Sequence, residues 1–313
     1  MLTTVRIHSA SIPDGSNMGT VIIILAFLCK TGFAAGHNQD VTTPVSLHAG
    51  AIDVGGTMMY YEVGGTGQPI LFIHAGVADC RMWDAQIGQL SLQHMVIRCD
   101  LRGFGRTPRG SVRFSHYRDV AALLDSLGIR RVNLVGASFG GRVAIDFALA
   151  YPQRIRSLIL CAPAISGMVP SSEMLGIDST EEAFLKKGDP EGAAEFNVQT
   201  WVVGPYRQPG EVPSTLRQRV KEMQLRNYAV PSPIGAESIP LEPRAITRLE
   251  KIVVPTLILI GDKDVPFFQS LSAIAANRIP NAKRNIIPDV AHMISMEKPE
   301  IFNRILVSFV ADK

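Results

Sequence analysis

Short runs of mostly apolar residues alternate with amphipathic segments along most of this sequence, and this alternation restricts the fold more than any other feature. Runs that are apolar on both faces are typical of strands in a parallel sheet covered by helices. The alternation therefore predicts an α/β fold with a mostly parallel, doubly wound sheet. Residues 46–62, with Gly55 and Gly56 between two strand-like runs, predict a preceding hairpin. The predicted strands are residues 70–73, 95–99, 132–135, 157–161, 256–260 and, more weakly, 283–287, and the predicted helices are 117–127, 141–151, 267–277 and 299–310.

Residues 165–244 interrupt the alternation. This segment is rich in proline, glycine and charged residues, and it contains no strand-like run of comparable strength. Helical stretches are predicted at residues 180–187, 191–203 and 214–227. We therefore expect an α/β core made of residues 46–164 and 245–313, with a helical cap, residues 165–244, inserted between two of its strands.

The first 40 residues differ from the rest of the chain. Residues 21–29 are apolar without a break, a run too short for a bilayer, which takes about 20 residues. Such a run fits the hydrophobic region of a secretory signal, and residues 33–36 supply small residues for a cleavage site. We expect residues 1–40 to be a leader and the protein to be exported. The alternative is a start codon placed too far upstream in a cytoplasmic protein.

Composition limits the classes of partner. Hydrophobic residues make up 46% of the chain and charged residues 19%, which allows a large buried core. The net charge is only +3 and the basic residues are scattered, so we expect no nucleic-acid partner. The cysteines lack metal-ligand spacing, and we expect Cys99 and Cys161 to be buried as small hydrophobic residues. Neither a metal nor an organic cofactor is expected.

The strongest chemical signal is a G-x-S-x-G pattern formed by Gly136, Ser138 and Gly140. It follows the predicted strand 132–135 and begins a predicted helix, which is the context of a nucleophile elbow. A serine on such a sharp turn needs glycine neighbours, because side chains there would collide with the turned chain. The start of the helix favours negative charge that develops near Ser138. We therefore predict that Ser138 is a catalytic nucleophile.

A serine hydroxyl needs a base, and an acid must orient that base. His292 lies in a loop after the last predicted strand and before the final predicted helix, so we predict that it is the base. Asp262 and Asp264 both follow the strand 256–260. We predict that Asp264 is the acid, because Asp262, next to a glycine, is explained by turn formation alone.

An oxyanion hole needs two backbone N–H groups. One is predicted to come from Phe139, the residue after the nucleophile, and the other from the loop after the strand 70–73. Gly76 is our choice in that loop, with Val77 as an open alternative. We expect His74, in the same loop, to be bound to turn backbone rather than to act as a base.

From about residue 50 to 313 the sequence resembles the α/β-hydrolase family. Residues 74–76 with Trp83 resemble the family's HG…W segment, although Ala75 stands where glycine is usual. Residues 100–107 resemble its structural D-x-R-G-x-G-x-S turn, with Thr107 in place of serine. Residues 261–264 resemble the G-x-x-D acid motif, and residues 292–299 the closing H-x-x-x-x-E-x-P motif. This resemblance implies an α/β-hydrolase fold with a helical cap, and it favours Asp264 independently.

Within the family, the elbow and the closing motif look most like esterases and 3-oxoadipate enol-lactonase-type hydrolases. Ser138 argues against the epoxide hydrolases and haloalkane dehalogenases, which use aspartate. Proline iminopeptidases usually have tryptophan where Phe139 stands. Carbon–carbon bond hydrolases typically have tryptophan after the catalytic histidine, where this chain has Met293.

We therefore expect a serine hydrolase that cleaves a small-molecule ester or lactone through an acyl-enzyme. A carbon–carbon bond or amide hydrolase with the same three residues is the alternative, and a non-catalytic ligand receptor is a second one. No stable membrane span is expected, and the sequence leaves the oligomeric state open. Several apolar cap residues are expected either to line an acyl pocket or to pack inside the cap: Met168, Met174, Trp201, Val202, Tyr206 and Met223.

Overall fold

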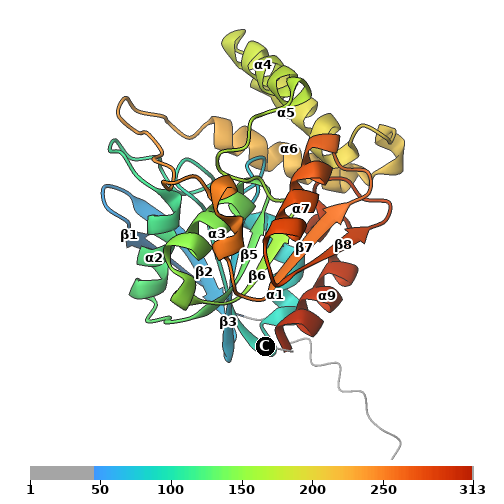
Figure 1. Cartoon of the computed structure of the whole chain (residues 1–313). Helices are drawn as coiled ribbons and strands as arrows, with labels where there is room; N and C mark the ends of the chain where they lie inside the picture. Colours follow the sequence, from blue (N-terminus) through green and yellow to red (C-terminus); the bar gives the residue numbers. More distant parts are fainter. Residues whose placement is uncertain (1–45, 312–313) are drawn as a thin grey trace, which may run out of the picture. The chain divides into compact units, whose positions relative to one another are not determined.

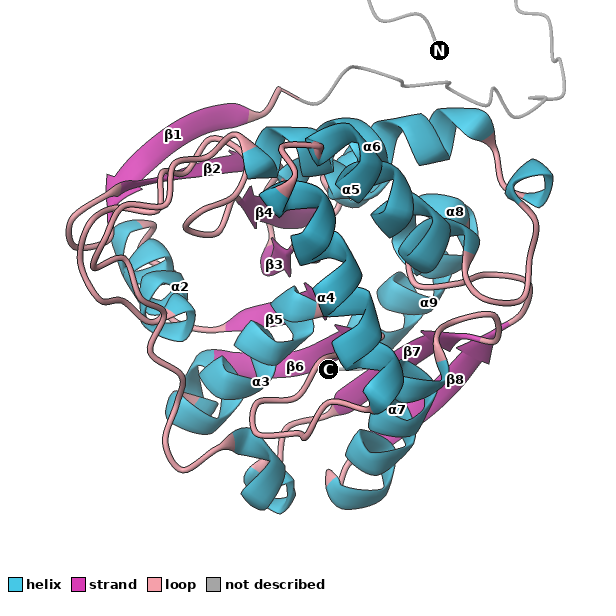
Figure 2. Ribbon diagram, turned by 90° about the horizontal axis from the view of Figure 1, so that it is seen from above, coloured by secondary structure: helices cyan, strands magenta, loops and turns pink. Residues whose placement is uncertain are grey.

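One sheet organises the protein. The computed structural model describes residues 46–311, and the expected leader, residues 1–40, lies outside them. The sheet in these residues has eight strands in the order β1-β2-β4-β3-β5-β6-β7-β8 (Figures 1 and 2). β1 pairs with β2, and β2 with β4, in antiparallel fashion, while all later neighbours are parallel. The strands are β1 His48–Asp53, β2 Met58–Gly64, β3 Gln68–Ile73, β4 His94–Cys99, β5 Val132–Ala137, β6 Ile155–Cys161, β7 Thr256–Gly261 and β8 Ala282–Ile287.

The predicted α/β architecture is confirmed, and helices cover both faces of the sheet. Figures 1 and 2 show α1 and α9 on one face and α2, α3 and α7 on the other. Every residue of β5 and β7 is buried, which explains why these strands are apolar without alternation. These helices are α1 Asp84–Leu90, α2 His116–Ser126, α3 Phe139–Ala150, α7 Pro266–Arg278 and α9 Pro299–Ala311, and the short α8 Ile294–Glu297 precedes α9.

The inserted segment 165–244 contains helices and loops and no strand, and all of it is described. Its helices are α4 Ser172–Lys186, α5 Pro190–Asn197, a π-helical segment Val198–Val203 and α6 Ser214–Tyr228. α4 begins eight residues earlier than predicted (172 against 180). None of its residues is buried, so no apolar stripe marks its first half in the sequence. No helix within residues 46–311 is long and apolar enough to cross a membrane.

The order of strands determines where a site can form. β3 has β4 on one side and β5 on the other, so the winding direction of the chain changes between β3 and β5. Loops that leave the carboxyl ends of strands at such a switch point diverge and create a crevice, where α/β proteins bind ligands. The segments that follow β3, β5, β7 and β8 all leave this edge, and they carry the residues that the sequence singles out.

The buried ion pair between Arg102 and Asp119 allows a test of what stabilises the loops at this edge. Its guanidinium group, 1% exposed, lies 2.7 Å from Asp119 and donates to the carbonyl oxygen of Gly55 at 3.0 Å. We expect Arg102→Met to lower the free energy of unfolding by about 3–5 kcal/mol, because it leaves a buried carboxylate unpaired. Arg113→Met, which breaks an ion pair whose side chains are 65% and 68% exposed, should cost under about 1 kcal/mol. Equal losses in urea unfolding would contradict this account.

Asp146 on α3 predicts how stability changes with pH. Burial raises its pKa to about 7, and the guanidinium groups of Arg142, Arg248 and Arg244 only partly oppose this rise. The unfolded chain releases this proton near the ordinary value of 3.8, so the folded chain binds more protons between about pH 4 and about pH 7. Stability should therefore fall as pH rises through that window.

Asp146→Asn removes this ionisation. The stability of the wild type relative to this variant, measured by urea unfolding, should be lower at about pH 7.5 than at about pH 5. A stability difference that does not change with pH would refute the assignment.

Candidate active site

Ser138 lies on a strained turn between β5 and α3. Its φ of 51° and ψ of −112° belong to a region that residues with side chains rarely adopt. The turn is held by the Ser138 N–H, which donates to the Cys161 carbonyl at 2.9 Å, and by the Ser138 carbonyl, which accepts from Ala164 at 3.0 Å. Such strain costs about 1–3 kcal/mol and persists only where the surrounding structure imposes it. The half-buried Ser138 side chain therefore stands at the first turn of α3.

The two glycines of the pattern are required by close backbone approach. A Cβ atom on Gly136 would overlap the carbonyl oxygen of Gly140, and one on Gly140 would overlap the carbonyl oxygen of Ile73. Neither residue has the positive φ that would call for glycine on conformational grounds. The glycines thus bring the elbow against the end of β3, where the predicted oxyanion loop begins.

His292 and Asp264 contact each other at the same edge of the sheet. The Nδ1 atom of His292 lies 2.9 Å from Oδ2 and 3.1 Å from Oδ1 of Asp264, and both side chains are buried. The Val265 N–H also donates to Asp264 at 2.7 Å and fixes the carboxylate. An Nδ1–H that donates to a carboxylate leaves the lone pair on Nε2, the tautomer that a general base needs. Asp262 instead pairs with Lys263 at 3.2 Å.

The hydroxyl of Ser138 and the imidazole of His292 are not hydrogen bonded to each other in the described structure. The catalytic hydrogen bonds of enzymes without substrate are often long and shorten only when substrate binds. The structure therefore brings the predicted acid and base into contact. The hydrogen bond between His292 and Ser138 is expected to form when substrate binds.

Two aromatic side chains enclose the imidazole of His292. The Phe268 ring lies 4.5 Å from it in an edge-on arrangement, and the Trp201 ring lies 5.0 Å from it. The His292 N–H also donates to the main-chain carbonyl of Trp201 at 3.2 Å. No sequence pattern indicates either contact, because Trp201 belongs to the inserted segment and Phe268 to α7. Together they shield the base from water.

The apolar cap residues singled out in the sequence differ in their burial. Val202 and Met223 are fully buried, whereas Tyr206 is 59% exposed. Met168 and Met174 are half-buried against the hydrophobic core. Trp201 is buried as well, and its ring also contacts His292.

The predicted oxyanion donors lie next to each other. A Cβ atom built on Gly76 would lie 3.5 Å from the Cβ of Phe139, which places the two main chains side by side. In the described chain, the amides of Gly76 and Phe139 donate to no other residue. Two such N–H groups beside a strained serine are the geometry that the predicted oxyanion hole requires.

His74 is bound to the backbone at both ring nitrogens. Nδ1 lies 2.8 Å from the carbonyl oxygen of Ala75, and Nε2 accepts from the Leu101 N–H at 3.0 Å. A histidine engaged in this way has no free lone pair to act as a base. The prediction of a structural role for His74 is confirmed.

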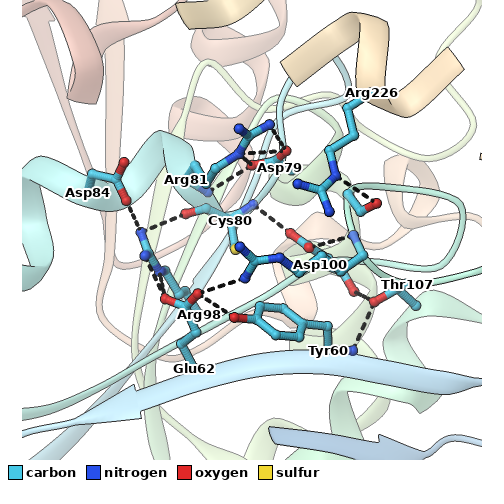
Figure 3. A network of polar contacts seen from close by, with 12 residues as sticks. Tyr60, Glu62, Asp79, Cys80, Arg81, Asp84, Arg98, Asp100, Thr107 and Arg226 are labelled. Carbon is cyan, nitrogen blue, oxygen red and sulfur yellow. Dashed lines mark hydrogen bonds and ion pairs between the residues drawn. The ribbon is translucent and has the colours of Figure 1, made fainter. Parts of the chain in front are cut away.

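A polar network stabilises the loop after β3, which we call the oxyanion loop because it contains the predicted donor Gly76 (Figure 3). The carboxylate of Asp100 accepts from the Cys80 N–H at 2.7 Å and from the Arg106 N–H at 2.8 Å. The Cys80 carbonyl accepts from Arg98 at 3.1 Å, and Arg98 also binds Glu62 at 2.7 Å. These bonds connect the loop after β3 to the turn after β4. They explain the structural role expected of residues 100–107.

Charge pairing in this network shifts the pKa values of buried groups. Burial alone would raise the pKa of Glu62, but hydrogen bonds from Tyr60 and Arg98 lower it overall. Burial and the hydrogen bond to Glu62 raise the pKa of Tyr60 to about 12. Glu62 is therefore an ionised acceptor and Tyr60 a neutral donor in this network.

Asp79, Cys80 and Asp100 are the one group of three potential metal ligands within residues 46–311. Both oxygens of Asp79 accept from Arg81, and both oxygens of Asp100 accept from main-chain amides. Burial, followed by the charge of Asp100, raises the pKa of the Cys80 thiol, which opposes the thiolate that metals bind. This group therefore builds the turn, and its donor atoms are committed to protein partners.

A cavity of about 970 Å³ lies at the opposite, amino edge of the sheet, and it is not near Ser138. Arginines around it bind the ends of strands and helices. Arg131 donates to the Ile155 carbonyl at 3.0 Å, and Arg154 donates to the Ile129 carbonyl at 2.8 Å. We therefore assign the chemistry to the carboxyl edge, where the unusual backbone and the buried His292–Asp264 pair lie.

Comparisons with known proteins agree with this fold. Residues 68–187 match the family model described as the alpha/beta hydrolase fold. The chain is 28% identical to the 2-hydroxy-6-oxo-6-phenylhexa-2,4-dienoate hydrolase of Comamonas testosteroni over 280 residues, which covers 83% of this chain and 94% of that protein.

Two solved structures resemble the chain over most of its length. Est816, described as an N-acyl homoserine lactone degrading enzyme, has a TM-score of 0.66 and 25% identity, covering 83% of this chain and 100% of its own. A thermophilic esterase from Thermogutta terrifontis, with malate bound, has a TM-score of 0.68 and 26% identity, covering 82% of this chain and 94% of its own. The chain has the α/β-hydrolase fold, and the proteins named here are those it resembles.

The two carboxylates after β7 give a direct test of the acid. Asp264→Asn should lower kcat for a p-nitrophenyl ester by about 10³–10⁴-fold, because the amide favours the wrong imidazole tautomer. Asp262→Asn is the matched control and should change kcat less than about threefold, since its partner is Lys263. Circular dichroism would verify that both variants fold. Similar losses in the two variants would show that the acid is misassigned.

Proposed function

We propose that this protein is a serine hydrolase that cleaves a carboxylic ester or lactone of a small molecule through an acyl-enzyme. The observation that carries the proposal is the positive φ of Ser138, enforced by Gly136 and Gly140 at the start of α3. Packing alone gives no reason for a strained serine at that point, whereas a nucleophile has to stand clear of the sheet.

The neighbouring residues supply the remaining roles. Nε2 of His292 takes the Ser138 proton as the hydroxyl oxygen attacks the carbonyl carbon, and Asp264 stabilises the imidazolium. The amides of Phe139 and Gly76 donate to the oxygen that becomes negative. His292 then gives its proton to the leaving alkoxide. Water attacks the acyl-enzyme by the same route in reverse, so that ester and water become acid and alcohol.

The likeness to Est816 and to the Thermogutta terrifontis esterase supports a lactone or ester as substrate. The Comamonas testosteroni relative, named as a dienoate hydrolase, is the reason to keep carbon–carbon bond cleavage as a second candidate. Met293 follows His292 in this chain, at the position where the carbon–carbon bond hydrolases typically have tryptophan. We therefore favour ester or lactone cleavage.

Labelling with a fluorophosphonate tests whether Ser138 is an activated nucleophile. We expect the wild type to be labelled at Ser138 and to lose activity, because the probe reacts with a serine activated by a base. Ser138→Ala should stay folded, bind no label and lose at least about 10³-fold in kcat. A wild type that resists the label would favour the non-catalytic receptor.

A substrate panel separates the reaction classes. It contains p-nitrophenyl esters of graded chain length, an N-acyl homoserine lactone, a p-nitroanilide and a 2-hydroxy-6-oxo-dienoate. We expect the highest kcat/KM on an ester or on the lactone, because the named structural relatives act on these bonds. A labelled enzyme that turns over only the dienoate or the anilide would overturn the ester assignment.

The oxyanion role of Gly76 has its own matched pair of variants. Gly76→Pro removes the N–H and should lower kcat by about 10²–10³-fold. Gly76→Ala keeps the N–H and should be mild, because its Cβ meets Phe139 at an ordinary 3.5 Å. Equal effects would exclude Gly76 as the donor, and the same test on Val77 would then follow.

A further inference from the structure

The last turn of α6 connects the inserted segment to two separate parts of the proposed active site. Tyr228, at the end of this helix, accepts a hydrogen bond from Asn197 at 2.9 Å. Asn197, which is fully buried, accepts in turn from the indole N–H of Trp201 at 3.0 Å. The Trp201 ring packs on His292, and the Trp201 carbonyl oxygen accepts a hydrogen bond from the main-chain N–H of His292. A continuous chain of contacts therefore links α6 to the base.

The same turn of α6 reaches the oxyanion loop through Asn227. Its side-chain NH₂ donates to the Ala78 carbonyl at 3.0 Å, and its side-chain oxygen accepts from the Gly105 N–H at 2.9 Å. Arg226 donates to the Gly105 carbonyl at 3.2 Å (Figure 3). The Ala78 N–H donates to Ala75 at 3.1 Å and closes the turn that contains Gly76. Asn227 thus binds the turn that presents the proposed oxyanion donor.

These contacts differ from what a cover over a pocket requires. A cover needs apolar packing and side chains aimed at the substrate, whereas these polar groups are aimed at catalytic loops. The hydrogen bonds are directional and partly buried, so breaking them leaves donors and acceptors without partners. The π-helical segment Val198–Val203, which carries Trp201, has a rare local geometry that is frequently found at functional sites.

We propose that residues 226–228 of α6 are a positioning element, which holds His292 through Trp201 and the Gly76 turn through Asn227. This inference rests on the proposed function of Ser138, His292 and Gly76. The cap in this position is part of the catalytic apparatus. If it moved away, His292 and the Gly76 turn would both lose the contacts that position them. Trp201 and Asn227 act through other residues, so their substitution affects the chemical step rather than substrate affinity.

Steady-state kinetics with p-nitrophenyl acetate tests the proposal, because so small a substrate needs few contacts with the cap. Asn227→Ala and Trp201→Leu should each lower kcat by about 10–10²-fold, since a misplacement of about 1 Å costs this much. KM should change less than about threefold. Trp201→Phe, which keeps a ring against His292, should retain more activity than Trp201→Leu. A change in KM with kcat intact would overturn the proposal.

Phe184→Leu is the matched control. Phe184 packs against Phe196 and beside Gly192 inside the inserted segment, and the centres of the two rings lie 6.3 Å apart. This variant should keep kcat within about twofold of the wild type. A loss as large as that of Asn227→Ala would mean that any disturbance of the cap suffices, which would overturn the specific role of residues 226–228.

A spectroscopic readout separates this proposal from the proposed function. The Nδ1 proton of His292, hydrogen bonded to Asp264, should give a downfield proton NMR signal in the wild type and in Phe184→Leu. Trp201→Leu should weaken or broaden it, whether or not an ester is turned over. An unchanged signal in Trp201→Leu would overturn the positioning of His292. A wild type with the signal but without fluorophosphonate labelling would instead count against the proposed function alone.

Discussion

The close approach of the β5–α3 turn to the end of β3 is the constraint on which the rest of the site depends. Glycine at 136 and 140 lets main chain meet main chain, and this contact puts Phe139 beside Gly76. It also forces Ser138 into its positive φ. The strain is offset by the packing around the turn, where every residue of β5 and the last four residues of β3 are buried. A looser turn would relax the serine and separate the two amides at once.

The sequence predicted the parts of the fold whose signal is local. β5 and β7 are apolar throughout because helices cover both their faces, and the elbow is marked by its two glycines. Ser138, Asp264 and His292 follow the parallel strands β5, β7 and β8, so their placement at one edge of the sheet could be predicted from the order of the strands. These features need only neighbouring residues, or the rule that parallel strands end at one edge.

Other features depended on pairings that no local pattern encodes. Arg98 lies inside an apolar strand without an evident partner, and the register of β2 with β4 sets Glu62 directly opposite it. α4 begins earlier than predicted. Its start could not be recognised in the sequence, because the helix buries none of its residues and so has no apolar stripe. Trp201 contacts His292, 91 positions further along the chain (292 − 201). Trp201 lies in the π-helical segment Val198–Val203, and no local sequence pattern marks that segment.

The residues of the proposed site lie far apart in the sequence, and this separation has a consequence for biosynthesis. The segments after β3 and β5 carry the amide donors and the serine, whereas the imidazole follows β8. A ribosome therefore completes the elbow well before it adds the histidine. In the proposed mechanism, a nascent or truncated chain that ends before β8 contains the serine without the base that removes its proton. Such fragments would be chemically inert, and hydrolytic competence would arise in one step, when the last strand joins the edge of the sheet.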